Sequence, residues 1–334
     1  MLLRIIGAKL SSEIDKKING LYDREDREEV GMKIIENEKL DMERALYGSW
    51  DVLVRNCAFD GPADGESALK ESSNVEVEDC FWNLRYPFWH DHGLKIRNTE
   101  LTELCRAALW YSDHIDIGDS KLHGIKALRE CQDVKIRGCH IISPEFGWSV
   151  KDIEMTDSSV QGEYFMMRSE NLKFQNVKLE GKYSFQYVEN GEFENCEFDT
   201  KDAFWHAKNV TVRNSIIKGE YFSWYSDGLT LINCKIIGTQ PLCYCKNLRL
   251  IDCEMEAADF AFEKSQVEAA VLTPVISIKN PASGCIHVPA VDEIIMDDPE
   301  AKGEILIGGK DSLRKCVVTV HTAGRHSLSG CVRT

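Results

Sequence analysis

Hydrophobic and polar residues along this chain repeat with a period of 19 residues over most of its length. With Asn74 as the first position of a coil, successive coils begin at Gly93, His114, Asp133, Asp152, Asn171, Asn190, Asn209, Gly228 and Asn247. The step from Gly93 to His114 has 21 residues, and a coil with four extra residues begins at Asp51. Such a period predicts one structural unit per repeat, stacked on its neighbours.

Within each repeat the second and fourth positions are apolar, as in Val75 and Val77, with polar residues between them. This alternation predicts a strand with one buried face. The ninth position is apolar again, the eleventh is often glycine, and the fifteenth is apolar, which predicts a bend and a second strand. Two short strands and two bends per unit predict an all-β, single-stranded parallel β-helix of about eleven to twelve coils. Right-handed winding follows the handedness of parallel crossovers.

The sixth and seventh positions predict a corner. The sixth is nearly always Asn or Asp, whose side chains hydrogen-bond turn backbone and form ladders between stacked coils. The seventh holds Cys57, Cys80, Cys139, Cys196, Cys234 and Cys253, with Ser or Thr in most other coils. Most of the 13 cysteines are therefore interpreted as small core-filling residues.

The ends differ from the repeat. Residues 1–31 form an N-terminal extension that is charged and predicted to hold a short helix capping the first coil. The β-helix is predicted over residues 32–310, decaying after Gln266 into irregular closing strands at Val275–Ile278 and Glu293–Ile295. Residues 311–334 are predicted to be an irregular C-terminal tail.

Charge and composition argue against several classes of binding partner. A formal net charge of −15 argues against nucleic acid and against an anionic membrane surface as the main partner. The first ten residues contain Arg4 and Lys9 and so lack an uninterrupted apolar signal segment, which predicts a cytoplasmic protein. His90, Asp91 and His92 lack evident further ligands, and the chain has no CxxC pair, so we expect no metal and no cofactor.

Several words along the repeats resemble a known family. They are MERALYGS at 42–49, GESALKESSN at 65–74, RYPFWH at 85–90, CRAALWYS at 105–112, IKALREC at 125–131 and ISIKNPASG at 276–284. With the repeat, they make residues 32–309 similar to an uncharacterised bacterial family of pectin-lyase-like β-helix proteins, a domain of unknown function. The resemblance implies a right-handed parallel β-helix and brings no established catalytic residues.

The sixteenth position, counted back from the start of the next coil, marks a candidate working face. Strand parity directs it and the fourteenth position outward. We call the residues at the sixteenth position the Trp strip: Tyr47, Lys70, Trp89, Trp110, Arg129, Trp148, Met167, Gln186, Trp205, Trp224, Cys243 and Phe262. The fourteenth position is small in the N-terminal coils (Ala45, Ala68, Pro87, Ala108 and Ala127), which predicts a groove lined by indole rings. Both coil-length irregularities enter the loop beside this strand, where solenoids take functional insertions.

Three interpretations of this face stay open. In the first it is a carbohydrate groove, with ligand-binding residues Glu66, Arg85, Trp89, Arg106, Trp110, Tyr111 and Trp148 and catalytic candidates Lys70, Glu71, His90, Asp91, Arg129 and Glu130. In the second it is an interaction surface for a partner or for a homo-oligomer. In the third a terminal segment covers the Trp strip, or the parity is shifted by one and buries it. The sequence favours a binding or interaction scaffold, with a polysaccharide lyase or hydrolase-like enzyme as the alternative.

Overall fold

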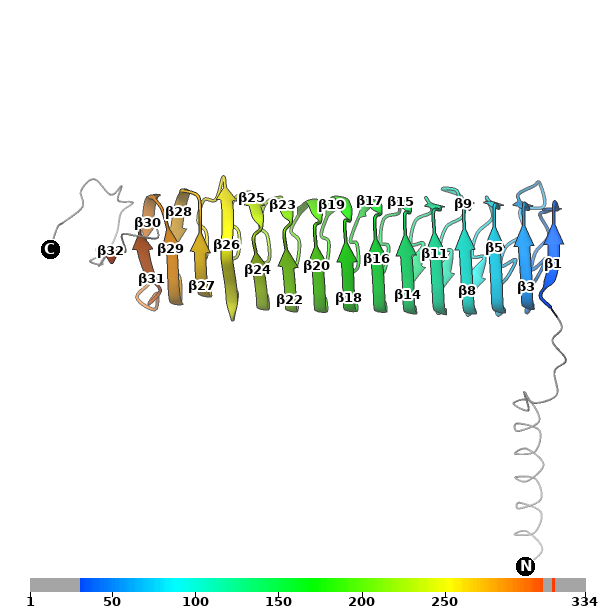
Figure 1. Cartoon of the computed structure of the whole chain (residues 1–334), viewed down its shortest axis with the longest axis horizontal. Coiled ribbons are helices and arrows are strands. Elements are labelled where there is room, and N and C mark those ends of the chain that lie inside the picture. Colours follow the sequence, from blue (N-terminus) through cyan, green and yellow to red (C-terminus); the bar gives the residue numbers. More distant parts are fainter. Residues whose placement is uncertain (1–30, 309–313, 316–334) are drawn as a thin grey trace, which may run out of the picture. The chain divides into compact units, whose positions relative to one another are not determined.

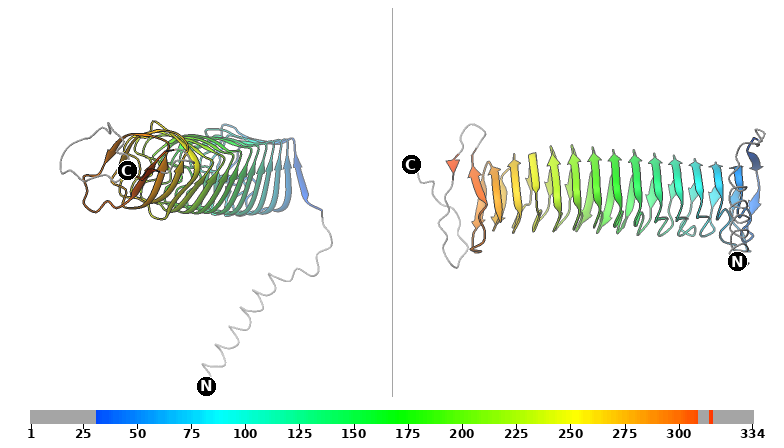
Figure 2. Two further views of the ribbon diagram at one scale, coloured as in Figure 1. Left: turned by 60° about the vertical axis from the view of Figure 1, so that its left-hand side comes forward. Right: turned by 90° about the horizontal axis from the view of Figure 1, so that it is seen from below.

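The computed structural model describes residues 31–308 and 314–315. Residues 34–308 form an all-β parallel solenoid of about 14 turns with a spacing of about 19 residues (Figures 1 and 2). No helix of the described residues is long and apolar enough to cross a membrane. The predicted capping helix falls on residues 1–30, and most of the predicted tail falls on residues 311–313 and 316–334. Both lie outside the described residues.

Sheet A runs through every turn and is built from the strand that carries the apolar second and fourth positions. Its parallel strands are β1 (Lys33–Glu36), β3 (Trp50–Arg55), β5 (Ser73–Glu78), β8 (His92–Arg97), β11 (Asp113–Gly118), β14 (Gln132–Arg137), β16 (Lys151–Thr156), β18 (Glu170–Gln175), β20 (Glu189–Glu194), β22 (Lys208–Arg213), β24 (Asp227–Ile232), β26 (Leu248–Glu256), β27 (Gln266–Val271), β29 (Ser283–Val288) and β31 (Glu304–Ile307). Strand β32 (Arg314–Lys315) pairs antiparallel with β31. The register places like positions side by side, for example Ile115 beside Leu94 and Val134.

Sheet B is a second parallel ladder around the ninth position. It contains β2 (Lys39–Leu40), β4 (Ala58–Phe59), β6 (Phe81–Trp82), β9 (Glu100–Leu101), β12 (Lys121–Leu122), β15 (His140–Ile142), β17 (Ser159–Glu163), β19 (Lys178–Lys182), β21 (Glu197–Lys201), β23 (Ile216–Lys218) and β25 (Lys235–Ile237), and it ends on the second half of β26. The sequence pattern predicted only an apolar position here, because two or three extended residues are too short to show alternation.

Sheet C covers the predicted second strand and is small. It consists of β7 (Phe88–Trp89), β10 (Leu109–Trp110) and β13 (Leu128–Arg129). In the later coils this segment is a turn in which left-handed residues alternate, as at Tyr183, Phe185 and Tyr187. The turns of the regular repeat therefore have three segments in place of the two that were predicted.

Two predictions about the ends of the repeat were wrong. The coil count of eleven to twelve is too low, because the solenoid continues on both sides of the clear repeat. The strands predicted at Val275–Ile278 and Glu293–Ile295 are present as β28 (Val275–Lys279) and β30 (Val291–Ile295), and they pair with each other in regular parallel register while β27, β29 and β31 extend sheet A. Phe262 also leaves the Trp strip, because one extra residue in its coil places it in the buried row of the fifteenth position.

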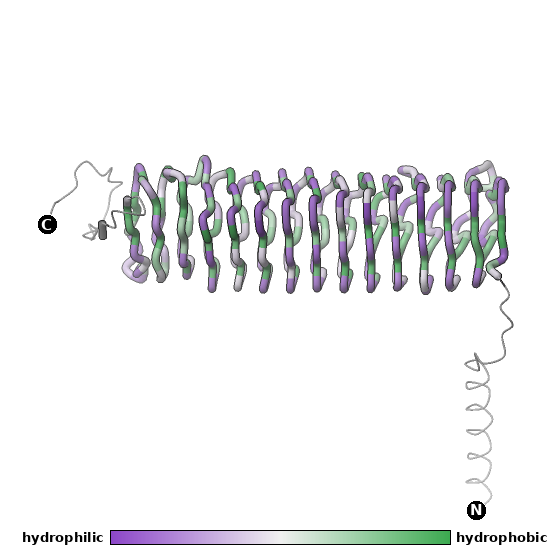
Figure 3. Tube along the Cα trace, viewed as in Figure 1, coloured by the Kyte–Doolittle hydropathy of each residue, from purple (hydrophilic) through white to green (hydrophobic). Residues whose placement is uncertain are grey.

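The corners follow the prediction. Residues at the sixth position are left-handed, with φ of 53° at Asp79 and 45° at Asn98, a conformation that Asn and Asp tolerate. Their side chains form ladders: Asn98 Nδ2 donates to Asp79 Oδ1 at 2.5 Å and Asn176 Nδ2 to Asp157 Oδ1 at 2.7 Å. The seventh-position thiols are buried, as predicted, and they also bind backbone. The Cys139 thiol, for example, is 3.3 Å from the Arg137 carbonyl oxygen. Figure 3 shows hydrophobic and hydrophilic residues alternating along each turn.

Candidate functional site

The sixteenth position faces outward and the fourteenth does not. Trp89, Trp110 and Trp148 are half-buried. The residues just before Trp89 and Trp110, at the fifteenth position, are buried in the core. The prediction that the small residues at position fourteen also face outward is wrong, since Ala68, Ala108 and Ala127 are buried in the core. Strand alternation fails here because the strand is two residues long and left-handed residues flank it. The indole rings are therefore not bordered by a trough of small side chains.

The N-terminal part of the Trp strip is a continuous column of stacked groups. The rings of Trp89 and Trp110 are parallel within 3° with centroids 4.9 Å apart. The Arg129 guanidinium lies between two indoles, with Cζ 5.1 Å from the Trp110 centroid and 5.2 Å from that of Trp148. Lys70 Nζ lies 5.7 Å from the Trp89 ring. Lys70 and Arg129 are thus placed as cation–π partners of the strip.

The indole N–H groups of this column bind the scaffold. Trp89 Nε1 donates to the Ala107 carbonyl at 2.6 Å, and Trp110 Nε1 donates to the Lys126 carbonyl at 2.7 Å. The same bond to the thirteenth position of the next coil recurs from Trp148, Trp205 and Trp224. Because ring faces pack on neighbouring coils and the N–H groups are bonded, the Trp strip presents mainly ring edges to solvent.

The seventeenth position forms a second row, which we call the outer column. Glu71 accepts a 2.5 Å hydrogen bond from the Tyr47 hydroxyl, and this bond raises the pKa of Tyr47. The His90 ring stacks on Tyr111 at 5.0 Å. Glu130 lies 3.4 Å from Arg129 in the next position of its own coil. The structure therefore brings Glu71, His90, Tyr111 and Glu130 to the edge of the Trp strip, each engaged with a neighbour.

The loop insertions carry charged residues that pair with one another. Arg85 donates to Glu66 at 3.0 Å and to Asp64 at 2.8 Å, and these bonds raise its pKa. Asp64 belongs to the four-residue insertion before Gly65. Arg106 Cζ lies 5.8 Å from the Tyr86 ring. The predicted binding residues Glu66 and Arg85 are thus joined as an ion pair at the edge of the strip.

Asp91 lies inside the solenoid and apart from the other catalytic candidates. Asp91 is 1% exposed. It occupies the eighteenth position of its coil, and Ser72 and Ser112 occupy the same position in the coils on either side. Asp91 Oδ1 accepts the Ser72 backbone N–H at 2.9 Å, while Oδ2 has no hydrogen-bond partner. Burial raises the pKa of its carboxyl to about 8. Among the described residues, no group of three or more His, Cys, Asp or Glu side chains has the arrangement of a metal site.

The C-terminal half of the outer column is more aromatic than its N-terminal half. Tyr187, His206, Tyr225 and Tyr244 form one stack with centroid distances of 4.9, 5.1 and 4.9 Å. Tyr187 is 46% exposed and Tyr225 is 47% exposed. Beside them, Trp205 and Trp224 stack in parallel at 5.3 Å. Reading the seventeenth position across all coils would have found this row, because it is aromatic in four consecutive coils.

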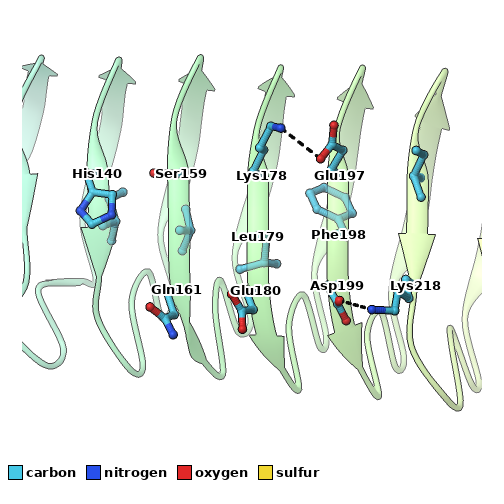
Figure 4. A pocket seen from close by; sticks show the side chains of 13 residues that line it. His140, Ser159, Gln161, Lys178, Leu179, Glu180, Glu197, Phe198, Asp199 and Lys218 are labelled. Atoms are coloured by element: carbon cyan, nitrogen blue, oxygen red, sulfur yellow. Dashed lines mark hydrogen bonds and ion pairs between the residues drawn. The ribbon is translucent and has the colours of Figure 1, made fainter.

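A shallow concavity of about 380 Å³ lies on the outer face of sheet B, over β15, β17, β19, β21 and β23 (Figure 4). Its charged side chains are largely paired, with Lys178 Nζ 3.2 Å from Glu197 and Lys218 Nζ 2.6 Å from Asp199. None of the binding or catalytic residues predicted from the sequence lines this concavity.

Comparison with solved structures finds other β-helix proteins at low identity. The surface adhesin PfbA of Streptococcus pneumoniae is 7% identical over 83% of this chain and 79% of its own, with a TM-score of 0.33. The A-module of the mannuronan C-5 epimerase AlgE4 of Azotobacter vinelandii is 9% identical over 82% of this chain and 87% of its own, with a TM-score of 0.29. The catalytic domain of a GH87 α-1,3-glucanase is 11% identical over 72% and 61%, with a TM-score of 0.30. Similarities at this level carry no argument about activity.

Sequence comparison places the chain in a family. No curated protein matches it. The model of one protein family matches residues 33–307, which is nearly all of the solenoid. The chain therefore belongs to the family described as Protein of unknown function (DUF3737).

Proposed function

We propose that the protein is a binding scaffold whose Trp strip and outer column form an interface for a protein partner. The observation that carries this proposal is the aromatic stack Tyr187–His206–Tyr225–Tyr244 of the outer column, which has Trp205 and Trp224 at the neighbouring positions of its coils. Tyr, Trp and Arg are the residues enriched at protein interfaces and at their energetically dominant positions. A row spanning many coils is also longer than a small-molecule site requires.

The placement of the catalytic candidates supports binding over catalysis. Asp91 is enclosed in the core, and Arg129 is held between two indoles. Glu71 accepts the Tyr47 hydroxyl, and Glu130 pairs with Arg129. A general acid or base must lie within hydrogen-bond reach of the substrate group whose proton it transfers, and its pKa must suit that task. Burial raises the pKa of the Asp91 carboxyl, but this side chain is enclosed and out of reach of a substrate on the outer face.

Carbohydrate binding by the same face is the second candidate. Exposed aromatic and charged groups beside Arg106 and Tyr111 favour a ligand rich in hydroxyl or carboxylate groups. Sugars pack on the faces of aromatic rings, and the faces of Trp89 and Trp110 cover each other. The geometry of the Trp strip therefore favours a protein partner over a stacked glycan.

Site-specific photo-crosslinking tests the proposed function. A photoreactive phenylalanine analogue is placed at Tyr111 or Tyr225 in the outer column, and at exposed Lys135 of β14 on sheet A as the matched control. We expect both outer-column positions to give the same discrete adduct in cells, and the control to give none. Adducts consisting only of this chain would identify a homo-oligomer as the partner. Equal crosslinking at all three positions contradicts the proposal.

Melting-temperature measurements with a panel of glycans test the second candidate function, carbohydrate binding. If the face binds carbohydrate, an acidic or neutral glycan should raise the melting temperature saturably, and Tyr111→Ala should remove the shift. We expect no such glycan-dependent shift.

A further inference from the structure

Two histidines from neighbouring coils meet on the outer face of sheet B. His123 directly follows β12, and His140 is the first residue of β15, which pairs with β12 in parallel register. The Nε2 atom of His123 lies 2.9 Å from the Nδ1 atom of His140, and the planes of the two rings are inclined by 70°. The pair forms no local motif in the sequence, because 17 residues separate its members.

This contact differs from the ion pairs on the same face, because it joins two bases. Side chains of neighbouring coils on sheet B pair a cation with a carboxylate, as Lys178 does with Glu197 at 3.2 Å. Two imidazole nitrogens 2.9 Å apart can share only one proton, so one ring donates and the other contributes its lone pair. A metal ion in place of that proton accepts a lone pair from both rings, since neutral imidazole binds metals through either nitrogen.

The ring of His123 is available as a ligand in its neutral form. Burial and the neighbouring imidazole of His140 lower the pKa of His123, although the carboxylates of Glu100 and Glu103 act in the opposite direction. His123 is therefore mainly unprotonated at neutral pH, as a metal-binding histidine has to be. Glu103 belongs to the two-residue insertion of the 21-residue coil, so this insertion adds a negative charge that favours a cation near the pair.

The separation of the two nitrogens selects the kind of ion. Imidazole nitrogen binds metal ions at about 2.0–2.1 Å. Two such bonds to atoms 2.9 Å apart enclose an angle of about 90°, whereas a tetrahedral ion needs a separation of about 3.3 Å. A right angle between neighbouring ligands is the geometry of tetragonal Cu(II) and Ni(II) sites. The rings have to turn until both lone pairs point at the ion, and the χ2 torsion of histidine is broad enough to allow this.

We propose that His123 and His140 form a chelating site for a divalent transition-metal ion, Cu(II) or Ni(II), bound through His123 Nε2 and His140 Nδ1. Each ring keeps a proton on its other nitrogen, so the neutral pair binds the ion without a net loss of protons. The pair supplies two ligands, and water or a second molecule fills the remaining positions of the ion. His140 is exposed and lines one end of the concavity over sheet B, so the bound ion is accessible there (Figure 4).

Calorimetric titration of the metal-free full chain with nickel chloride tests the site, because Ni(II) does not oxidise thiols. Wild type should bind Ni(II) saturably. His123→Gln and His140→Gln should each weaken binding about tenfold or more, because loss of even an outer-shell partner of a ligating histidine costs roughly 10- to 100-fold. His92→Gln removes an exposed imidazole that pairs with Asp113, and this matched control should bind as wild type does. No saturable binding to wild type, or an equal effect of all three substitutions, overturns the proposal.

Copper spectroscopy counts the bound imidazoles and separates chelation from a change in the fold. With less than one equivalent of Cu(II), the electron paramagnetic resonance spectrum of wild type should be tetragonal and its nitrogen couplings should report two imidazoles. Each glutamine variant of the pair should report one at most. The metal-free variants should melt close to wild type, because His140 is exposed and His123 is half-buried. The same number of coupled imidazoles in wild type and in His123→Gln overturns the proposal.

The metal site goes beyond the proposed interface and is independent of it. The histidine pair belongs to the sheet B side of its coils and shares no residue with the Trp strip or the outer column. His123→Gln should therefore give the same crosslinked adduct at Tyr225 as wild type does. Failure of nickel binding overturns the metal site and leaves the proposed function intact.

Discussion

Replacing Asp91 by serine is expected to stabilise the solenoid at neutral and alkaline pH. The eighteenth position is a buried row in which serine side chains bridge neighbouring coils. Ser112 Oγ accepts the Asp91 N–H at 2.9 Å and donates to the Phe88 carbonyl at 2.9 Å. Asp91 accepts the Ser72 N–H in the same way, but its second oxygen has no partner. A serine at position 91 can make both bonds of the row and leaves no carboxylate oxygen unpaired.

The magnitude follows from the pKa of the Asp91 carboxyl, which burial raises from 3.8 to about 8. The folded state therefore holds this proton more tightly than the unfolded state does. Stability is fully present below pH 3.8 and is lost as the pH rises through 8, by about 1.4 kcal/mol for each pH unit between these values. The carboxyl thus costs about 4 kcal/mol at pH 7 and on the order of 6 kcal/mol above pH 8. Serine does not titrate in this range.

Urea unfolding followed by circular dichroism at pH 5, 6, 7 and 8 measures this effect. The stability difference between Asp91→Ser and wild type should widen steadily with pH. Asp91→Asn should also lose the pH dependence, but without the gain at pH 5, because its amide N–H groups have no buried acceptor. Asp199→Ser, at an exposed and ion-paired position, is the matched control and should change little. A constant difference between Asp91→Ser and wild type from pH 5 to 8 would refute the reasoning.

Three further substitutions test how the coils are held together. Trp110→Phe keeps a ring in the stack but removes the N–H bond to Lys126, and should lower the free energy of unfolding by about 1 kcal/mol, whereas Trp110→Ala should cost several times more. Arg129→Lys should cost about 0.5–1 kcal/mol at low salt, because an ammonium does not stack between Trp110 and Trp148; an unchanged urea midpoint would contradict the sandwich. Gly65→Ala should destabilise by more than 2 kcal/mol, since its Cβ would lie 2.2 Å from the backbone of Met42 and Glu43, whereas Gly31→Ala, with nothing within 4 Å, should be neutral in the same assay.

Much of the fold is predictable from the sequence because each stacked coil needs the same residue types at the same positions, so the pattern recurs about every 19 residues. Asn and Asp recur at nearly every left-handed sixth position, with Gly138 as the exception, and apolar residues recur at most inward positions of sheet A. The segments that were missed leave weaker signals. Two-residue strands such as Phe81–Trp82 cannot show alternation, and the coils after Gln266 keep their pairing while their spacing changes.

The sequence predicted which aromatic residues of the candidate site face outward, but it did not predict how their side chains are oriented. The outward direction of Trp89 and Trp110 followed from their place beside the core residue of each coil. The burial of Ala108 did not, because left-handed residues at Ala107 and Tyr111 break the alternation on which parity depends. Whether an indole shows its face or its edge depends on the next coil, since both the stacking partner and the acceptor of the N–H group are about one repeat away.

The stacking that holds the coils together also determines where this surface can bind. In an unbroken row each ring covers the face of its neighbour, so Trp205 and Trp224 or Tyr225 and Tyr244 offer mainly edges to a ligand. Ring faces open only where a row lacks a ring. Arg129 interrupts one row and fills the gap with its own guanidinium. Asp202 interrupts another row, and there Lys201 Nζ lies 5.0 Å from the Tyr221 centroid, so at both interruptions a cation of this chain packs on the ring face that the missing ring would have covered.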